Sequence, residues 1–149
     1  MAAASQQILD AIKALLIAGA TVAAGRVFVD HVDALQAADL PALLIEEGDD
    51  GERVETAFLD GSQRRELSVV INCLLAATDT AAADSRSLGV AVEKLVYPHA
   101  ALRTLARYGV NLAENRLVMN GEGDRLLANR QQTWRIAFCV NPANPDVIL

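Results

Sequence analysis

The amino-acid sequence predicts an α+β fold in which helices pack on one face of an antiparallel or mixed β-sheet. Apolar residues recur at helical spacing near the start and in the middle of the chain, whereas several other segments alternate between apolar and polar residues. The strand-like segments are adjacent to one another rather than separated singly by helices, which favours antiparallel or mixed pairing. A length of 149 residues is typical of one domain, so we assign residues 1–149 to a single domain.

A helix is expected at the start of the chain. Ser5 is a favourable N-cap, and Ile8, Ile12 and Leu16 recur on one side at helical spacing. Gly19 stands where this helix should end.

Strand signals follow the first helix. From Arg26 the apolar pattern has a period of two, and Pro41 can open a second strand over residues 42–47 because the first strand position needs no ladder donor. The glycines and aspartates of residues 48–51 are typical of a turn. Residues 53–59 are then expected to form a further short strand.

The clearest strand signal covers residues 65–77. One face of this strand carries the apolar residues Leu67, Val69, Ile71, Cys73 and Leu75. The opposite face begins with polar residues, so we expect one side of the strand to face a core.

A second helix is expected after this strand, with Thr78 and Thr80 as candidate caps. Its apolar stripe consists of Leu88, Val92, Leu95 and Val96. Pro98 disfavours helical geometry at the preceding residue and should end the helix. A short helical turn over residues 100–107 can follow before Gly109 releases the chain into a strand.

The last part of the chain is expected to be a hairpin. It comprises a strand over about residues 110–120, a turn at 121–124, a strand over 130–140 and an irregular tail from about residue 141. Strand faces and helix stripes together predict a core of Ile12, Leu16, Leu67, Val69, Ile71, Cys73, Leu88, Val92, Leu95, Trp134, Ile136 and Phe138.

Motifs for chemistry are missing from the sequence. It contains no nucleophile elbow, paired-cysteine motif or dinucleotide fingerprint. Asp30, His31 and Asp33 resemble metal ligands, but on a strand His31 points away from Asp30, and metal sites usually need three or four converging ligands. We therefore expect no catalytic, metal or cofactor site, and no enzymatic activity.

Composition indicates a protein of a reducing cytoplasm. The sequence has no apolar run of roughly 20 residues that could span a bilayer and no secretion signal at its start, so no membrane partner is expected. Its two cysteines, Cys73 and Cys139, lie in apolar alternating runs and are expected to be buried thiols.

Charge is distributed unevenly along the chain, whose net charge is −6. One stretch contains a single base, Arg53, and the acids Asp30, Asp33, Asp39, Glu46, Glu47, Asp49, Asp50, Glu52, Glu55 and Asp60. A later stretch contains the arginines Arg103, Arg107, Arg116, Arg125, Arg130 and Arg135. The net charge argues against nucleic-acid binding, and the two stretches form either two solvated faces or opposite-sign surfaces that meet between subunits.

The order of these segments resembles the tail-terminator family of tailed bacteriophages and prophages, also called tail-completion or minor tail proteins. The resemblance covers roughly residues 8–140 and is carried by the opening helix, the strand Leu-Pro-Ala-Leu-Leu-Ile at residues 40–45, the acidic turn after it and the Arg-rich start of the long strand. A mid-chain helix and a final alternating strand complete the pattern. The segment 99–108 departs from the family because it is longer than the usual link.

The resemblance implies a structural assembly protein. Family members form a ring, commonly a hexamer, which caps the tail tube, stops its polymerisation and presents a surface to head-completion proteins. The implied partners are other copies of the chain, the tail-tube protein, the head-completion protein and the DNA that passes through the lumen without specific binding. The implied location is the bacterial host cytoplasm during assembly and then the head-proximal end of the virion tail.

Two other functional classes stay open. One is another phage structural protein, such as a head–tail joining protein or a tail-tube subunit, which a long arm or loop would favour. The other is a small bacterial ligand-binding or enzymatic domain, which a pocket with converging polar groups would favour.

The candidate functional residues come from the charge asymmetry. We expect the acids Asp49, Asp50 and Glu52 to lie at a subunit interface or on the lumen of a ring. In the same hypothesis the arginines Arg116, Arg125 and Arg130 lie near a neighbouring subunit or the tube end. No residue is assigned to catalysis, to a metal or to a cofactor.

Overall fold

A mixed β-sheet and three α-helices make up the part of the chain that a computed structural model describes, residues 2–31, 33, 35–122 and 125–149. The strands are β1 (Val27–Val29), β2 (Ala42–Ala57), β3 (Gln63–Ala76), β4 (Gly109–Glu122), β5 (Arg125–Asn141) and β6 (Asn144–Ile148). The helices are α1 (Ala4–Ala18), α2 (Ala81–Val96) and α3 (Ala100–Leu105), with a short 3-10 helix η1 (Ala37–Asp39) between β1 and β2.

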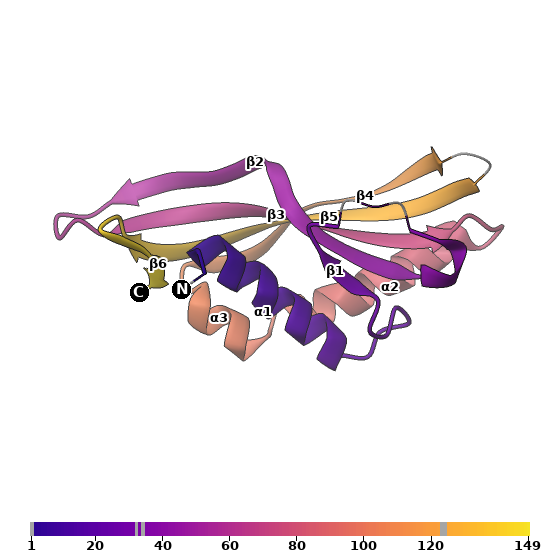
Figure 1. Cartoon of the computed structure of the whole chain (residues 1–149), viewed down its shortest axis with the longest axis horizontal. Helices are drawn as coiled ribbons and strands as arrows, with labels where there is room; N and C mark the ends of the chain where they lie inside the picture. Colours follow the sequence, from indigo (N-terminus) through magenta and orange to yellow (C-terminus); the bar gives the residue numbers. More distant parts are fainter. Residues whose placement is uncertain (1, 32, 34, 123–124) are drawn as a thin grey trace.

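The sheet has the strand order β1-β2-β3-β5-β4, and β6 pairs with the end of β5. β1 runs parallel to β2, and the other described pairings are antiparallel. All three helices lie on one face of this sheet, which leaves the other face open (Figure 1). The predicted fold class, an α+β arrangement with helices on one face of a mixed sheet, is therefore confirmed.

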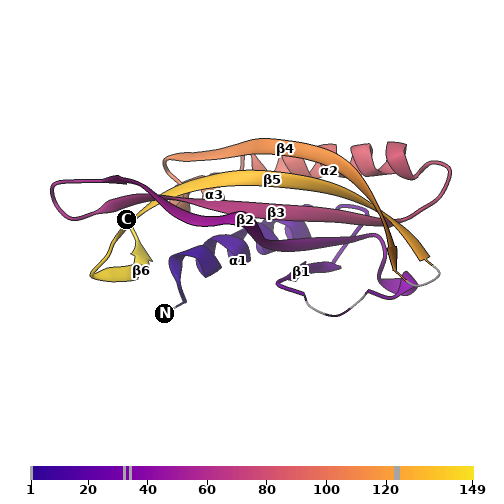
Figure 2. The same cartoon turned by 90° about the horizontal axis from the view of Figure 1, so that it is seen from above.

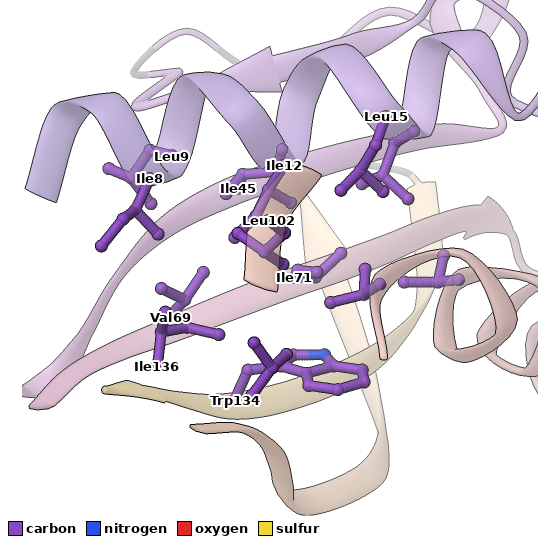
Figure 3. Close-up of a cluster of buried hydrophobic side chains, with 14 of the residues drawn as sticks. Ile8, Leu9, Ile12, Leu15, Ile45, Val69, Ile71, Leu102, Trp134 and Ile136 are labelled. Atoms are coloured by element: carbon purple, nitrogen blue, oxygen red, sulfur yellow. The ribbon is translucent and has the colours of Figure 1, made fainter. Parts of the chain in front are cut away.

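The core lies between the helices and the central strands β3 and β5. Figure 3 shows Ile12 of α1 and Leu102 of α3 above Ile71, Val69 and Trp134 of the sheet. Eleven of the predicted core residues belong to one cluster of buried side chains, and the twelfth, Leu95, is partly buried against it. The periods of 3.6 and 2 in the sequence thus located the buried faces correctly.

Helix boundaries follow the predicted signals in part. α1 ends before Gly19, and α2 ends at Val96, two residues before Pro98, as expected. The predicted N-cap Ser5 is wrong, because α1 begins at Ala4 and its cap residue is Ala3, with no side-chain cap. Thr80 does occupy the N-cap position of α2, but its hydroxyl donates to the Asp84 carboxylate at 2.9 Å instead of capping a backbone amide.

The turn predicted at residues 48–51 is wrong, because these residues form a bulge inside the continuous strand β2. Glu47 pairs with Val69 and Glu52 pairs with Leu67, so four residues of β2 lie opposite Ser68 alone. Gly51 adopts a φ of 61°, which glycine accepts without strain. Glycine and aspartate residues often reverse the direction of a chain. In this protein they bend strand β2, and the parts of β2 before and after the bend both pair with β3.

The irregular C-terminal tail is also a wrong prediction, because residues 144–148 form β6. The Asn141 side chain accepts a hydrogen bond from the amide of Ala143 at 2.9 Å and closes a tight turn. The returning chain then pairs Ile148 with Val140. Pro145 is tolerated because an edge strand needs no donor on its outer side. Of the predicted turn at 121–124, Gly121 and Glu122 instead belong to β4 and pair with β5, whereas Gly123 and Asp124 lie outside the described residues.

Candidate assembly surfaces

The open face of the sheet is polar and partly cross-linked by hydrogen bonds. Strand alternation puts Ser68 and Asn72 of β3 on this face, because Leu67, Val69 and Ile71 point into the core. Asn129 of β5 donates to Asn72 at 2.9 Å, and Asn72 donates to the Glu46 carboxylate of β2 at 3.1 Å. These bonds hold three neighbouring strands in register without a covering layer.

The bulge of β2 borders a depression of about 350 Å³ on this open face. Asp49 and Asp50 line it from the bulge, Glu46 from β2 and Arg116 from the edge strand β4. A Cβ atom on Gly48 would lie 2.3 Å from the Ser68 hydroxyl, so the bulge packs closely on β3. Two predicted acids and one predicted arginine therefore meet around one hollow of a single chain.

Three of the six predicted charged residues form ion pairs within the chain. Asp50 pairs with Arg53 at 2.9 Å, and Glu52 pairs with Arg65 at 3.2 Å. Arg116 lies 3.4 Å from the carboxylate of its neighbour Glu114. Pairs as exposed as those of Asp50 and Arg116 contribute only about 0–1 kcal/mol.

Arg130 lies on the helix-covered face, away from Asp49, Asp50 and Arg116 on the open face. Glu52 pairs with Leu67 and so also points to the helix side of the sheet. The Arg130 side chain is 9% exposed, and one of its amino groups donates to the Ser85 hydroxyl of α2 at 3.3 Å. It therefore contributes to the packing of α2 and is not part of the open face. The backbone of Arg125 begins β5, but its side chain lies outside the described residues.

The sequence predicts a turn at Asp60-Gly61, between β2 and β3, but not that this turn exposes two large apolar side chains. This turn, residues 58–62, is called the hairpin tip below, and it projects beyond the helices at one end of the molecule (Figure 2). Leu59 is fully exposed, and Phe58 is 41% exposed. The available signal was two large apolar residues placed directly before Asp60-Gly61, where a turn gives no core to pack against.

Hydrogen bonds within the hairpin tip give it a defined shape. The Ser62 hydroxyl and the Ser62 amide donate to the Asp60 carboxylate at 2.6 and 2.9 Å. Both bonds stabilise the charged carboxylate and lower the pKa of Asp60. The amide of Phe58 also donates to the Ser62 carbonyl at 2.8 Å.

A second surface feature lies beside α2. The apolar side chains of Val22, Leu75, Leu88 and Ala91, with Asp84 and Ser87, line a pocket of about 320 Å³, called the α2 pocket below. Val22 is 67% exposed. The pocket therefore gathers four apolar side chains at the surface of the molecule.

The described residues offer little for chemistry. No group of three or more His, Cys, Asp or Glu side chains among them could hold a metal ion. Both cysteines are buried free thiols, as predicted, and burial raises the pKa of Cys73 to about 12. A thiol with that pKa carries almost no thiolate at neutral pH. Among the described helices, none has the length and apolar character needed to cross a bilayer.

Comparison with known proteins adds a weak structural similarity. No family model matches the sequence, and no curated protein sequence matches it. A solved structure described as the virion of a native gene transfer agent particle is similar over 91% of this chain and 92% of that chain, with 16% sequence identity and a TM-score of 0.45. A similarity at this level does not assign a function or a partner to the chain.

Proposed function

We propose that this chain is a structural protein of a phage-type particle and, more specifically, a tail terminator. In this proposal copies of the chain form a ring of six subunits on the end of the tail tube. The ring stops polymerisation of the tube protein and offers its outer surface to a head-completion protein. The chain performs no catalysis and binds no cofactor.

The observation that carries an assembly role is the projecting hairpin tip. A fully exposed leucine beside a partly exposed phenylalanine, held on two long paired strands, places apolar surface where only another molecule can cover it. Such surface is unfavourable in water unless a partner buries it.

The specific role rests on the family resemblance. The chain has an opening helix, the strand that follows Pro41, a long strand with an Arg-rich start, a mid-chain helix and an alternating strand near its end, as the resemblance implies. It departs from the resemblance in that the acidic segment is a bulge within β2 and not a turn. A projecting arm would also suit a head–tail joining protein or a tube subunit. Binding only at tube ends is expected of a tail terminator, so a tube-binding experiment distinguishes this role from the other two.

The open face is proposed to line the lumen of the ring. Glu46, Asp49 and Asp50 make this face acidic around the depression, so it would repel passing DNA and keep it from binding. Because Asp50 and Glu52 already pair with Arg53 and Arg65, few of the acids are left to bind a neighbouring subunit. The lumenal placement is therefore favoured over the interfacial one.

Sedimentation with purified tail tubes tests this function. A terminator binds only at tube ends, so shearing the tubes at constant mass should raise the bound amount in proportion to the number of ends. The double variant Asp49→Asn/Asp50→Asn should bind as well as wild type if these two acids face the lumen. Binding that follows total tube mass would instead indicate a protein that coats or extends the tube.

A further inference from the structure

We propose that the hairpin tip of one copy inserts Leu59 and Phe58 into the α2 pocket of the next copy in the ring. This inference rests on the proposed ring and names the contact that builds it. Leu59 is fully exposed on the tip, and the pocket is lined by the apolar side chains of Val22, Leu75, Leu88 and Ala91 together with Ser87 and the acidic Asp84. Joining the two would remove apolar surface of both from water.

The two features lie at opposite ends of the molecule. The tip leads directly into Gln63 at the start of β3, whereas Leu75 at the other end of β3 lines the pocket. Twelve residues of extended strand separate them by about 40 Å, at roughly 3.3 Å per residue. Both views show the β2–β3 turn at one end of the sheet and the β3–α2 connection at the other (Figures 1 and 2). The tip of one chain therefore cannot fill the pocket of the same chain.

This geometry allows a head-to-tail contact between copies, because the tip and the pocket are different surfaces at opposite ends of one chain. An antiparallel pair that exchanged both tips is the alternative, and in the crosslinking test below it would give dimers instead of a ladder. Contacts between unlike surfaces continue from subunit to subunit and close into a ring when the rotation allows it. Each copy would then give one tip and receive one tip.

The size of the contact explains why a tube is needed as a template. A stable pairwise interface buries about 800 Å² per partner, and a tip with two apolar side chains offers much less. A pair of copies held by this contact alone should therefore dissociate readily. In a closed ring each subunit is held at both ends, and the tube end adds further contacts that keep neighbours together.

Crosslinking of engineered cysteines tests the contact without tubes. Leu59→Cys and Ser87→Cys place thiols on the tip and at the pocket, and the natural Cys73 and Cys139 are buried and do not compete. Treated with a short bismaleimide at high protein concentration, the Leu59→Cys/Ser87→Cys protein should give a ladder of covalent oligomers. Mixing the two single variants should give only dimers.

Matched variants identify the surface involved. Val90 is exposed on α2 but does not line the pocket, so Leu59→Cys/Val90→Cys should give no ladder. Adding Ala91→Phe to the reactive pair should fill the pocket and abolish the ladder. Equal ladders from the Ser87 and Val90 pairs, or homodimers formed by Leu59→Cys alone as the main product, would overturn the proposal.

The outcome can be separated from that of the proposed function. Caps on tube ends without the specific ladder would reject this contact and leave the terminator role intact. A specific ladder without binding to tube ends would support the contact and reject the terminator role.

Discussion

Replacement of Trp134 by alanine is expected to lower the free energy of unfolding by about 3–5 kcal/mol, the range for removing a buried aromatic side chain. Trp134 is 1% exposed and lies on the central strand β5, where it faces the helices and takes part in the single large core cluster. The surrounding side chains come from both helices and strands and cannot all move in to fill the space. Urea unfolding followed by circular dichroism measures the change.

The neighbouring residue provides a matched control for this variant. Arg135 sits on the same strand but faces the open side, with its side chain 57% exposed and a long ion pair to Glu66 of 3.8 Å. Arg135→Ala should change stability by no more than about 1 kcal/mol. Equal unfolding midpoints for Trp134→Ala and wild type would contradict the assignment of the helix-facing side as the core.

Replacement of Gln132 by leucine is expected to destabilise the protein although the side-chain volume hardly changes. Gln132 is completely buried; it donates to the Gly89 carbonyl of α2 at 2.9 Å and accepts from the Trp134 indole at 3.3 Å. Leucine would leave the carbonyl and the indole N–H without these partners. Each orphaned buried group costs about 1–3 kcal/mol. The same urea experiment measures the loss.

A double-mutant cycle distinguishes lost hydrogen bonds from altered packing. Trp134→Phe removes the indole N–H, so Gln132→Leu should cost less in that background than in wild type. Gln131, the preceding residue on the open face, bonds only to Arg116 among the described residues, and Gln131→Leu should be nearly neutral. Strictly additive losses at positions 132 and 134 would show that the indole bond contributes nothing.

The buried faces of the fold were predictable because they depend on periodicity. Leu67, Val69 and Ile71 recur at every second position, opposite a face that begins with polar residues, and only one arrangement of such a strand buries its apolar side. Leu88 and Val92 recur at helical spacing in the same way. These patterns hold whatever the strand order is, so the layers could be predicted although the pairing partners could not.

Predictions failed where local composition has two structural meanings. Glycine and aspartate at residues 48–51 suit both a turn and a bulge, and the choice depends on whether the flanking segments pair with the same strand, β3. Pro142 and Pro145 indicated an irregular tail, but β5 offers a free edge on which the returning chain can pair. Both outcomes depend on contacts between distant segments.

The candidate surfaces were only partly predictable for a similar reason. Charge counts along the sequence identified Asp49, Asp50 and Arg116, which do meet on the open face. They could not distinguish exposed from buried arginines, and Arg130 lies under α2 because an even-numbered position on β5 faces the helices. The exposure of Phe58 and Leu59 was not predicted, because both residue types are common in strands. The sequence does not show that the turn after them lies outside the core.

Growth of tail tubes in the presence of this protein tests the central claim most directly. Tube protein is allowed to polymerise with and without the purified chain, and electron microscopy records the tube lengths and the appearance of the tube ends. The terminator role predicts that added protein stops elongation and leaves a ring of density at one end of each tube. Tubes that keep their full growth and bare ends, while the protein stays monomeric beside them, would contradict both the ring and the family assignment.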